Sequence, residues 1–280
     1  MNMLSVKKLT KTYETFKLNE VSFDLPEGYI MGFIGRNGAG KTTALKSMLG
    51  LVHADYGNVE INGLNFFENE FECKQNIGVV FGEFDFYSLK KLKDIADVTK
   101  RFYENWDDKK YNHYIKRFKL EPNKRIKELS TGMKVKFALA LALSHHAKLL
   151  ILDEPTSGLD PVSRDQLIEI FQEIIEDGNH SILFSTHIIS DLEKCADYIT
   201  YIKDGQILTT AETDLFTESY RSIVGKIDAL TPELETKLIG CRKHKFGFEA
   251  IIKTSDIPTS SDFEITACDL ENIMIHIERE

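Results

Sequence analysis

One eight-residue segment constrains this chain more than any other. The sequence GRNGAGKT, Gly35 to Thr42, follows the apolar run Tyr29–Ile34 and precedes a helix expected from about Thr42 to Leu49. Glycines let successive backbone N–H groups curl around an anion, and the following helix directs its positive end at the same charge. A fortuitous glycine turn is the alternative. The order of strand, glycine loop and helix favours a phosphate-binding loop and predicts nucleotide binding.

The residues of this loop have distinct expected roles. Lys41 is expected to reach the β- and γ-phosphates, the Thr42 hydroxyl to ligate Mg²⁺, and Thr43 to donate to the α-phosphate. ATP with Mg²⁺ is therefore the expected ligand. The residues expected to contact it here are Gly35, Arg36, Asn37, Gly38, Ala39, Gly40, Lys41, Thr42 and Thr43.

A second motif, LLILDEPTSGLD, runs from Leu149 to Asp160. Its four apolar residues predict a buried strand that brings Asp153 to its carboxyl end, where α/β sheets place their ligands. Asp153 suits a direct or indirect role on Mg²⁺, and Glu154 is the candidate general base for the attacking water. Taken alone, the pair reads equally well as an ordinary helix cap. The phosphate loop upstream favours the catalytic interpretation.

Strands and helices alternate along most of the chain, which predicts an α/β fold with a largely parallel, helix-covered sheet. A mostly helical stretch, 89–120, and a long helix, 128–144, interrupt the alternation as an insertion of about 60 residues. From about residue 211 a small α+β appendage is expected, with a strand at 245–253 and a terminal helix at 269–277. The other expected elements are strands at 21–25, 29–34, 59–61, 77–81, 149–152 and 181–185, helices at 42–49, 162–175 and 188–195, and a hairpin at 199–208.

A third motif, LSTGM from Leu129 to Met133, opens the long helix. It reads as a helix N-cap, and a capped helix start also binds anions. With this motif the sequence resembles ABC-transporter nucleotide-binding domains, whose signature is usually LSGGQ, over about residues 1–215. The resemblance implies a P-loop NTPase fold of ABC type, in which a RecA-like core sheet carries an antiparallel β subdomain and a helical subdomain at about 83–147. A small accessory domain would occupy 216–280.

The resemblance also implies a dimer, because in that family the signature closes on ATP held by a partner subunit. Ser130 and Gly132 would contact that γ-phosphate, and Asp160 lies in the segment that passes between the two ATP sites. Tyr13 matches the aromatic that stacks on adenine. His187 matches the switch histidine that contacts the γ-phosphate and joins Glu154 and Lys41 as catalytic residues.

Two departures from the family pattern stand out. Thr131 and Met133 replace the common glycine and glutamine, and Met133 lacks the amide. The position of the usual Mg²⁺-linking glutamine is Gly82, which cannot ligate a metal, although Glu83 could do so if the loop shifts by one residue. Aromatic residues surround this position and either form a groove for a membrane partner's coupling helix or pack the helical subdomain: Phe81, Phe84, Phe86 and Tyr87.

Charge and composition limit the partners. The net charge of −9 argues against nucleic acid as the main partner and against electrostatic adhesion to an anionic membrane. No secretory signal is visible, and no apolar run approaches the ~20 residues that span a bilayer. We therefore expect a cytoplasmic protein, peripheral on the inner face of the cell membrane through a transmembrane permease partner. It would act as a homodimer or as a heterodimer with a related ATPase.

Three functions stay open at this level. The first is an exporter ATPase, because the C-terminal DLENIMIHIERE and the segment FYENWD resemble ABC-2-type bacterial drug and peptide exporters, including bacitracin-resistance-like ATPases. The second is an importer ATPase with the same chemistry. The third is a regulatory ATP-binding module of low turnover, against which Glu154 and His187 argue. A DNA-repair or translation-factor ABC protein fits less well, and the sequence does not identify the cargo.

Overall fold

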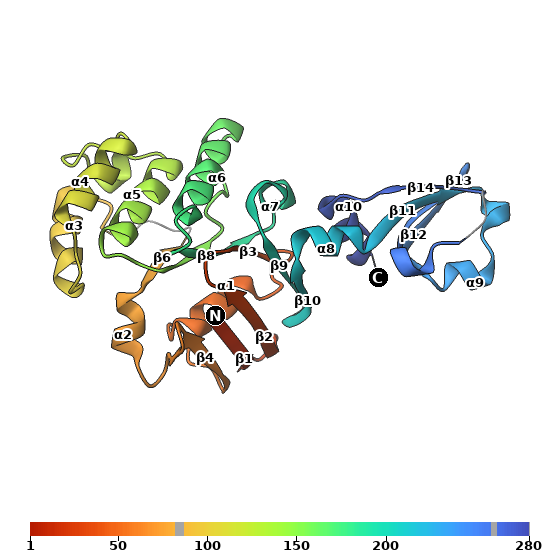
Figure 1. The fold of residues 1–280 in the computed structure, drawn as a ribbon, viewed down its shortest axis with the longest axis horizontal. Helices are drawn as coiled ribbons and strands as arrows, with labels where there is room; N and C mark the ends of the chain where they lie inside the picture. The colour runs from red at the N-terminus through yellow and green to blue at the C-terminus, as the bar shows by residue number, and fades with distance from the viewer. Residues whose placement is uncertain (82–86, 259–261, 280) are drawn as a thin grey trace. The chain divides into compact units, whose positions relative to one another are not determined.

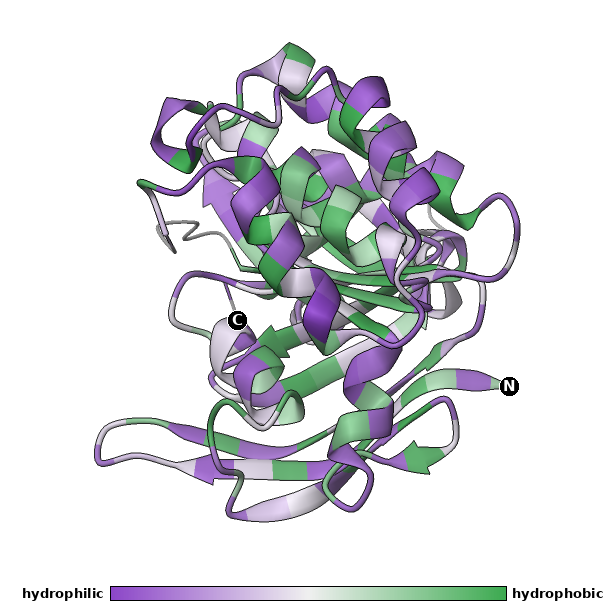
Figure 2. Ribbon diagram, turned by 90° about the vertical axis from the view of Figure 1, so that its left-hand side faces the viewer, coloured by the Kyte–Doolittle hydropathy of each residue, from purple (hydrophilic) through white to green (hydrophobic). Residues whose placement is uncertain are grey.

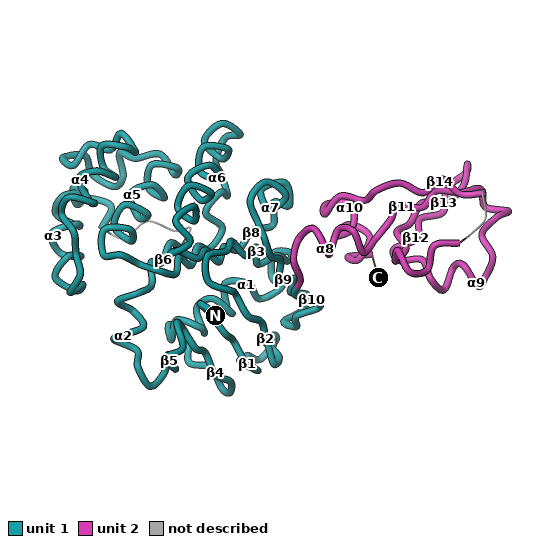
Figure 3. Tube along the Cα trace, viewed as in Figure 1, with its two compact units in different colours: residues 1–210 teal, residues 211–280 magenta. Residues whose placement is uncertain are grey.

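The computed structural model describes residues 1–81, 87–258 and 262–279. The chain forms two compact units, residues 1–210 and residues 211–280 (Figure 3). The domain boundary expected at 215/216 stays a prediction.

A six-stranded sheet forms the centre of the first unit (Figure 1). Its strand order is β10-β9-β3-β8-β7-β6, and the five strands from β9 to β6 run parallel. Every residue of β3, β7 and β8 is buried, as parallel strands require when helices cover both faces. The predicted parallel α/β sheet is confirmed. The strands are β3 (Ile30–Ile34), β6 (Ile77–Phe81), β7 (Leu149–Asp153), β8 (Ser181–Thr186), β9 (Tyr198–Lys203) and β10 (Gln206–Glu212).

The helices that connect these strands are α1 (Lys41–Met48), α6 (Pro161–Ile175) and α7 (Ile189–Cys195). In Figure 2 the helices nearest the viewer mix purple hydrophilic and green hydrophobic residues, whereas the strands behind them are largely green. The hairpin β9–β10 turns at Asp204 and Gly205, both with positive φ, as the predicted Asp-Gly turn requires.

A second sheet, antiparallel and of order β2-β1-β4-β5, packs on the other side of α1. Apolar side chains of β1 and β2 share one core with Met31 and Phe33 of β3 and with Ala44, Leu45 and Met48 of α1. This sheet is the antiparallel subdomain that the family resemblance implies. Its strands are β1 (Asn2–Thr12), β2 (Lys17–Pro26), β4 (Tyr56–Ile61) and β5 (Leu64–Asn65), and the short helix α2 (Glu70–Gln75) leads from it to β6.

A helical insertion lies between β6 and β7, as predicted. The long helix begins at Thr131 rather than at the expected Glu128, because the Ser130 side chain caps it by accepting a hydrogen bond from the Met133 N–H at 3.3 Å. The expected helical stretch 89–120 is broken at residues 103–107, where the Asp107 side chain caps the next helix. The helices are α3 (Leu92–Thr99), α4 (Asp108–Arg117) and α5 (Thr131–Ser144), with 3-10 turns at Lys100–Phe102 and Ile126–Glu128.

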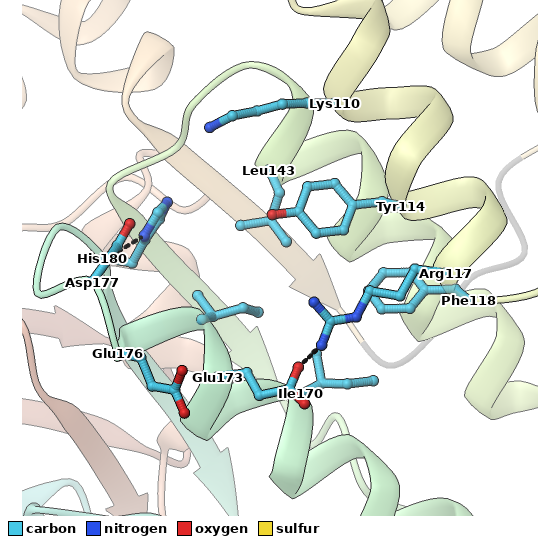
Figure 4. Close-up of a pocket in the computed structure, with 11 residues that line it drawn as sticks. Lys110, Tyr114, Arg117, Phe118, Leu143, Ile170, Glu173, Glu176, Asp177 and His180 are labelled. Carbon is cyan, nitrogen blue, oxygen red and sulfur yellow. Dashed lines mark hydrogen bonds and ion pairs between the residues drawn. The ribbon is translucent and has the colours of Figure 1, made fainter.

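The insertion meets the core across a polar cavity of about 230 Å³ between α4, α5, α6 and the turn at 176–180 (Figure 4). An ion pair between Arg117 of α4 and Glu173 of α6 crosses it, and Tyr114 of α4 and Leu143 of α5 also line it. The helical insertion is therefore joined to the core in two ways: through this polar contact with α6, and through the buried packing of α5 on β6.

The second unit is a four-stranded antiparallel sheet of order β12-β13-β11-β14. One face packs Ile223, Phe248 and Ile252 into a small core, and α10 packs on β12 and β13. The predicted α+β composition and terminal helix are confirmed. The elements are β11 (Tyr220–Gly225), β12 (Leu238–His244), β13 (Gly247–Lys253), β14 (Phe263–Ala267), α8 (Thr213–Glu218), α9 (Pro232–Glu235) and α10 (Leu270–Ile277), with 3-10 turns at Ile227–Ala229 and Thr254–Asp256.

His145 predicts how the stability of the first unit depends on pH. Its ring is buried, stacks on Tyr103 with centroids 3.6 Å apart, and lies 3.3 Å from the Gln75 carbonyl oxygen. Burial lowers the pKa of His145 from 6.5 to about 4. Between pH 6.5 and about pH 4 the imidazole of the unfolded chain binds a proton and that of the folded chain does not, so the free energy of unfolding falls as pH falls. Urea unfolding should show a loss of about 2 kcal/mol from this group between pH 7 and pH 5.

The variant His145→Phe provides the control, because it keeps an aromatic ring on Tyr103 and cannot titrate. Its unfolding free energy should lack this component of the pH dependence. Equal pH slopes in the variant and the parent chain would show that His145 is not the group responsible.

Candidate nucleotide-binding site

The glycine-rich loop follows β3 directly and leads into α1. Gly38 and Gly40 have φ of 88° and 108°, in the left-handed region that favours glycine. A Cβ at Gly35 would stand 2.4 Å from the Ile202 carbonyl oxygen, so this position also needs glycine. No side chain caps the first turn of α1, and its first turn holds no acidic residue. The helix start is therefore open to an anion.

Lys41 is held inside the curve of this loop. Its side chain is 6% exposed, and Nζ donates to the carbonyl oxygens of Gly35 at 2.6 Å and Arg36 at 3.3 Å. The same Nζ lies 3.2 Å from Oε1 of Glu154. The backbone carbonyl oxygens of the loop thus hold the ammonium in position, as expected for a phosphate-binding lysine.

Asp153 ends β7 and joins two neighbouring segments. One carboxylate oxygen accepts a hydrogen bond from the Thr42 hydroxyl at 2.8 Å, and the other accepts one from the Ser185 hydroxyl at 2.5 Å. A hydroxyl and a carboxylate at this spacing are oxygen ligands of the kind Mg²⁺ takes, with the rest supplied by phosphate and water. The described residues contain no cluster of three or more His, Cys, Asp or Glu side chains suited to a metal ion.

Glu154 occupies an unusual backbone position. Its φ is +50°, which is costly for a residue with a side chain, and its N–H donates to the Ser185 hydroxyl at 3.0 Å. This conformation turns the carboxylate between two basic groups. Oε1 faces Lys41, and Oε2 lies 2.8 Å from Nδ1 of His187, at the end of β8. The three predicted catalytic residues therefore meet at one place.

A cavity of about 370 Å³ opens over this place. Most of the residues predicted to contact the nucleotide line this cavity. Gly35, Ala39 and Asp153 do not line it, because they are buried. Phe16 and Ser157 also line it and were not predicted, and neither was the bridging Ser185. Glu83 and Gly82 lie outside the described residues. The lining residues are Phe16, Arg36, Asn37, Gly38, Gly40, Lys41, Thr42, Thr43, Glu154, Ser157 and His187.

Besides Gly35, Ala39 and Asp153, four further predicted site residues do not line this cavity: Tyr13, Ser130, Gly132 and Asp160. Ser130 caps α5, and Gly132 packs near Leu159. Asp160 caps α6, where hydrogen bonds from the side chain and backbone of Ser163 lower its pKa. Tyr13 is 45% exposed and lies beside Lys11, with Nζ 5.7 Å from the ring centre. The roles expected for these residues stay predictions.

A parallel sheet with a phosphate loop, an Asp-Glu pair and His187 at its carboxyl edge defines a P-loop ATPase of the ATP-binding-cassette class. The family model described as ABC transporter matches residues 18–157, and the chain belongs to the ABC transporter family. It is an ATPase and an ATP-binding subunit of such a transporter. No described helix has the length and apolar character needed to cross a membrane.

Known proteins resemble this chain over most of its length. It is 30% identical over 222 residues to the ABC transporter ATP-binding protein YtrB of Bacillus subtilis, covering 79% of this chain and 76% of the relative. It is 32% identical over 209 residues to the bacitracin transport ATP-binding protein BcrA of Bacillus licheniformis, covering 74% and 68%. A solved structure of an ATP-binding subunit of an ABC transporter matches with a TM-score of 0.68 at 26% identity, covering 76% and 90%.

The role expected for Tyr13 can be tested apart from phosphate binding. Replacing a ring that stacks on a base costs about 1–3 kcal/mol, so Tyr13→Ala should raise the Kd for ATP by about 10-fold. Binding of inorganic triphosphate, measured by the same calorimetric titration, should not change, because the phosphate loop is intact.

Tyr29→Ala is the matched control, because Tyr29 is 42% exposed and its ring packs edge-on against Tyr198. This variant should bind ATP as the parent chain does. Unchanged ATP affinity in Tyr13→Ala would show that Tyr13 does not hold the base.

Proposed function

We propose that this chain powers a separate membrane-spanning permease by closing and opening a two-subunit sandwich around Mg·ATP. The observation that carries the proposal is the position of the signature motif. Ser130 and Gly132 do not line the cavity of their own phosphate loop, although the N-terminus of the 14-residue α5 has the charge of an anion site. No acidic residue stands in its first turn. A nucleotide on a partner subunit is the ligand that fits this helix start.

The same geometry supports a hydrolytic role for each residue at the sheet edge. Lys41 would turn from Glu154 to the γ-phosphate as ATP binds, since both anions compete for one ammonium. Glu154 then keeps His187 as its partner and accepts a proton from the attacking water. Thr42 and Asp153 would hold Mg²⁺, which neutralises charge on the phosphates. Loss of the γ-phosphate removes the contact that joins the two subunits.

An apolar groove on the first unit suits the permease. This groove, which we call the α1–β6 groove, has a volume of about 350 Å³ and joins the end of α1 to β6 and the helical insertion. Leu51 and Val79 in it are 58% and 38% exposed. Exposed apolar patches on a protein of this type mark interaction sites. Its lining residues are Leu49, Leu51, Lys74, Ile77, Val79, Phe81 and Tyr103.

The resemblance to ABC-2-type exporters supports a proposal on the direction of transport. The chain shares 32% identity with a protein named for bacitracin transport. We propose that it serves export of a peptide or drug from the cell, while the permease selects the cargo. The chain would then act on the cytoplasmic face of the membrane, held there by the permease.

The sandwich is tested with a variant that binds ATP without hydrolysing it. Glu154→Gln removes the base but keeps a side chain of the same shape. Size-exclusion chromatography with light scattering should show a monomer without nucleotide and a dimer with Mg·ATP. Adding Ser130→Arg should abolish the dimer while ATP still binds, because the bulky cation blocks the start of α5. A dimer that forms equally well with Ser130→Arg would contradict the sandwich arrangement.

The groove is tested by placing a charge in it. Leu51→Asp with Val79→Asp should lower recovery of the chain with its co-expressed permease by about 10-fold, because a carboxylate would be desolvated on docking. ATP hydrolysis by the purified chain should persist. Leu208→Asp is the control, since Leu208 is 50% exposed on β10, away from the groove. Equal recovery of both variants would exclude this groove as the docking site.

A further inference from the structure

Three buried polar atoms without hydrogen-bond partners gather beside the catalytic residues. They are Oγ1 of Thr156, Nε of Arg164 and Oδ2 of Asp191, three of five such side-chain atoms in the described part of the chain. Nε of Arg164 lies 3.9 Å from Oδ1 of Asp191, too far for a hydrogen bond. The Thr156 hydroxyl is close enough to Asp191 to influence its pKa, yet makes no bond of ordinary geometry. Buried polar groups are nearly always satisfied, so this cluster requires an explanation.

The three residues come from the segments that carry the predicted machinery. Thr156 follows Glu154 by two residues, before the segment expected to face the partner subunit. Arg164 is in the first turn of α6, where its N–H donates to the Asp160 carbonyl oxygen. Asp191 is in the first turn of α7, four residues after His187. The cluster therefore connects the expected dimer contact to the helix that follows the switch histidine.

Burial of the Asp191 carboxylate costs desolvation free energy. Asp191 is 2% exposed, and burial raises the pKa of its carboxyl group. The groups that act against burial are the Thr156 hydroxyl and the charges of Arg164, Lys194 and His187. A buried carboxylate with its cation at 3.9 Å recovers little of its desolvation cost. Asparagine would fill the same volume without this cost.

Joining α6 to α7 does not require Asp191. The same helices are bridged at the surface by Asp165 and Lys194, whose charged atoms are 2.5 Å apart. The side chain of Gln172 also donates to the Lys194 carbonyl oxygen at 2.8 Å. A merely structural explanation of the buried charge is therefore weak.

We propose that Asp191 is a positioning residue for ATP hydrolysis, which closes onto Thr156 and Arg164 when the two subunits engage. The inference rests on the proposed sandwich mechanism. Pressure of the partner on the segment 157–160 shifts Thr156 and Arg164, and the long contacts become hydrogen bonds. Asp191 then fixes the start of α7 and with it the position of His187 against Glu154. Hydrolysis is thereby coupled to correct engagement of the partner.

The test uses Asp191→Asn and Thr156→Val in the full-length chain. Both substitutions keep the side-chain volume; Thr156→Val removes an unsatisfied hydroxyl and Asp191→Asn removes a buried charge, so the melting temperature should stay equal or rise. The kcat for ATP should nevertheless fall by about 10-fold or more in each, with KM within about 2-fold. The double variant should be no slower than Asp191→Asn, because both changes remove one shared contact.

Two further variants separate positioning from packing. Asp191→Glu, which can reach across the 3.9 Å gap, should recover most of the kcat. Asp165→Asn should leave kcat within about 2-fold of the parent, although it removes the surface bridge between the same helices. Near-parental turnover in Asp191→Asn, or an equal loss in Asp165→Asn, would overturn the proposal.

Dimerisation distinguishes this proposal from the one on which it rests. Asp191→Asn with Mg·ATP should accumulate as a dimer, because closure proceeds and hydrolysis is slow. A variant that remains monomeric while Glu154→Gln dimerises would refute the role of Asp191 and leave the sandwich intact. Failure of Glu154→Gln itself to dimerise would refute the sandwich.

Discussion

The site depends on the parallel register of three neighbouring strands. In β3, β8 and β7, Ile34 pairs with Thr186 and Asp153 pairs with Ser185. The segments that follow these three strands therefore leave the sheet at the same edge and lie next to one another. The phosphate loop follows β3, the Asp-Glu pair stands at the end of β7, and His187 follows β8. A slip of one residue between β7 and β8 would separate Ser185 from Asp153 and undo the site.

Local patterns in the sequence predict much of this arrangement. The phosphate loop is recognisable because its glycines, lysine and threonine are contiguous and lie between a strand and a helix. The Asp-Glu pair after a buried strand reads equally well as a helix cap, and the phosphate loop upstream is what favoured Glu154 as the candidate base. The structure brings Lys41, Glu154 and His187 within hydrogen-bonding range, which shows that these motifs share one location.

Other features could not be predicted because they depend on tertiary contacts. Nothing in the local pattern distinguishes Phe16 from its neighbours, and it lines the cavity only because β1 and β2 pack beside the loop. Ser185 gains its role from pairing with β7, which is 32 residues away in sequence. The long helix was expected at 128–144, and the cap at Ser130, which the LSTGM motif predicts, sets its first residue at Thr131.

The left-handed backbone of Glu154 limits which amino acids the position can accept. Valine, isoleucine and threonine are disfavoured at a φ of +50°, because their branched Cβ crowds the backbone there. Glycine relieves the strain but gives up the side chain, and asparagine tolerates it best among the remaining polar residues. Few amino-acid types should therefore occur at this position among natural sequences. Inactive relatives would arise through glutamine, asparagine, aspartate or glycine more readily than through any β-branched residue.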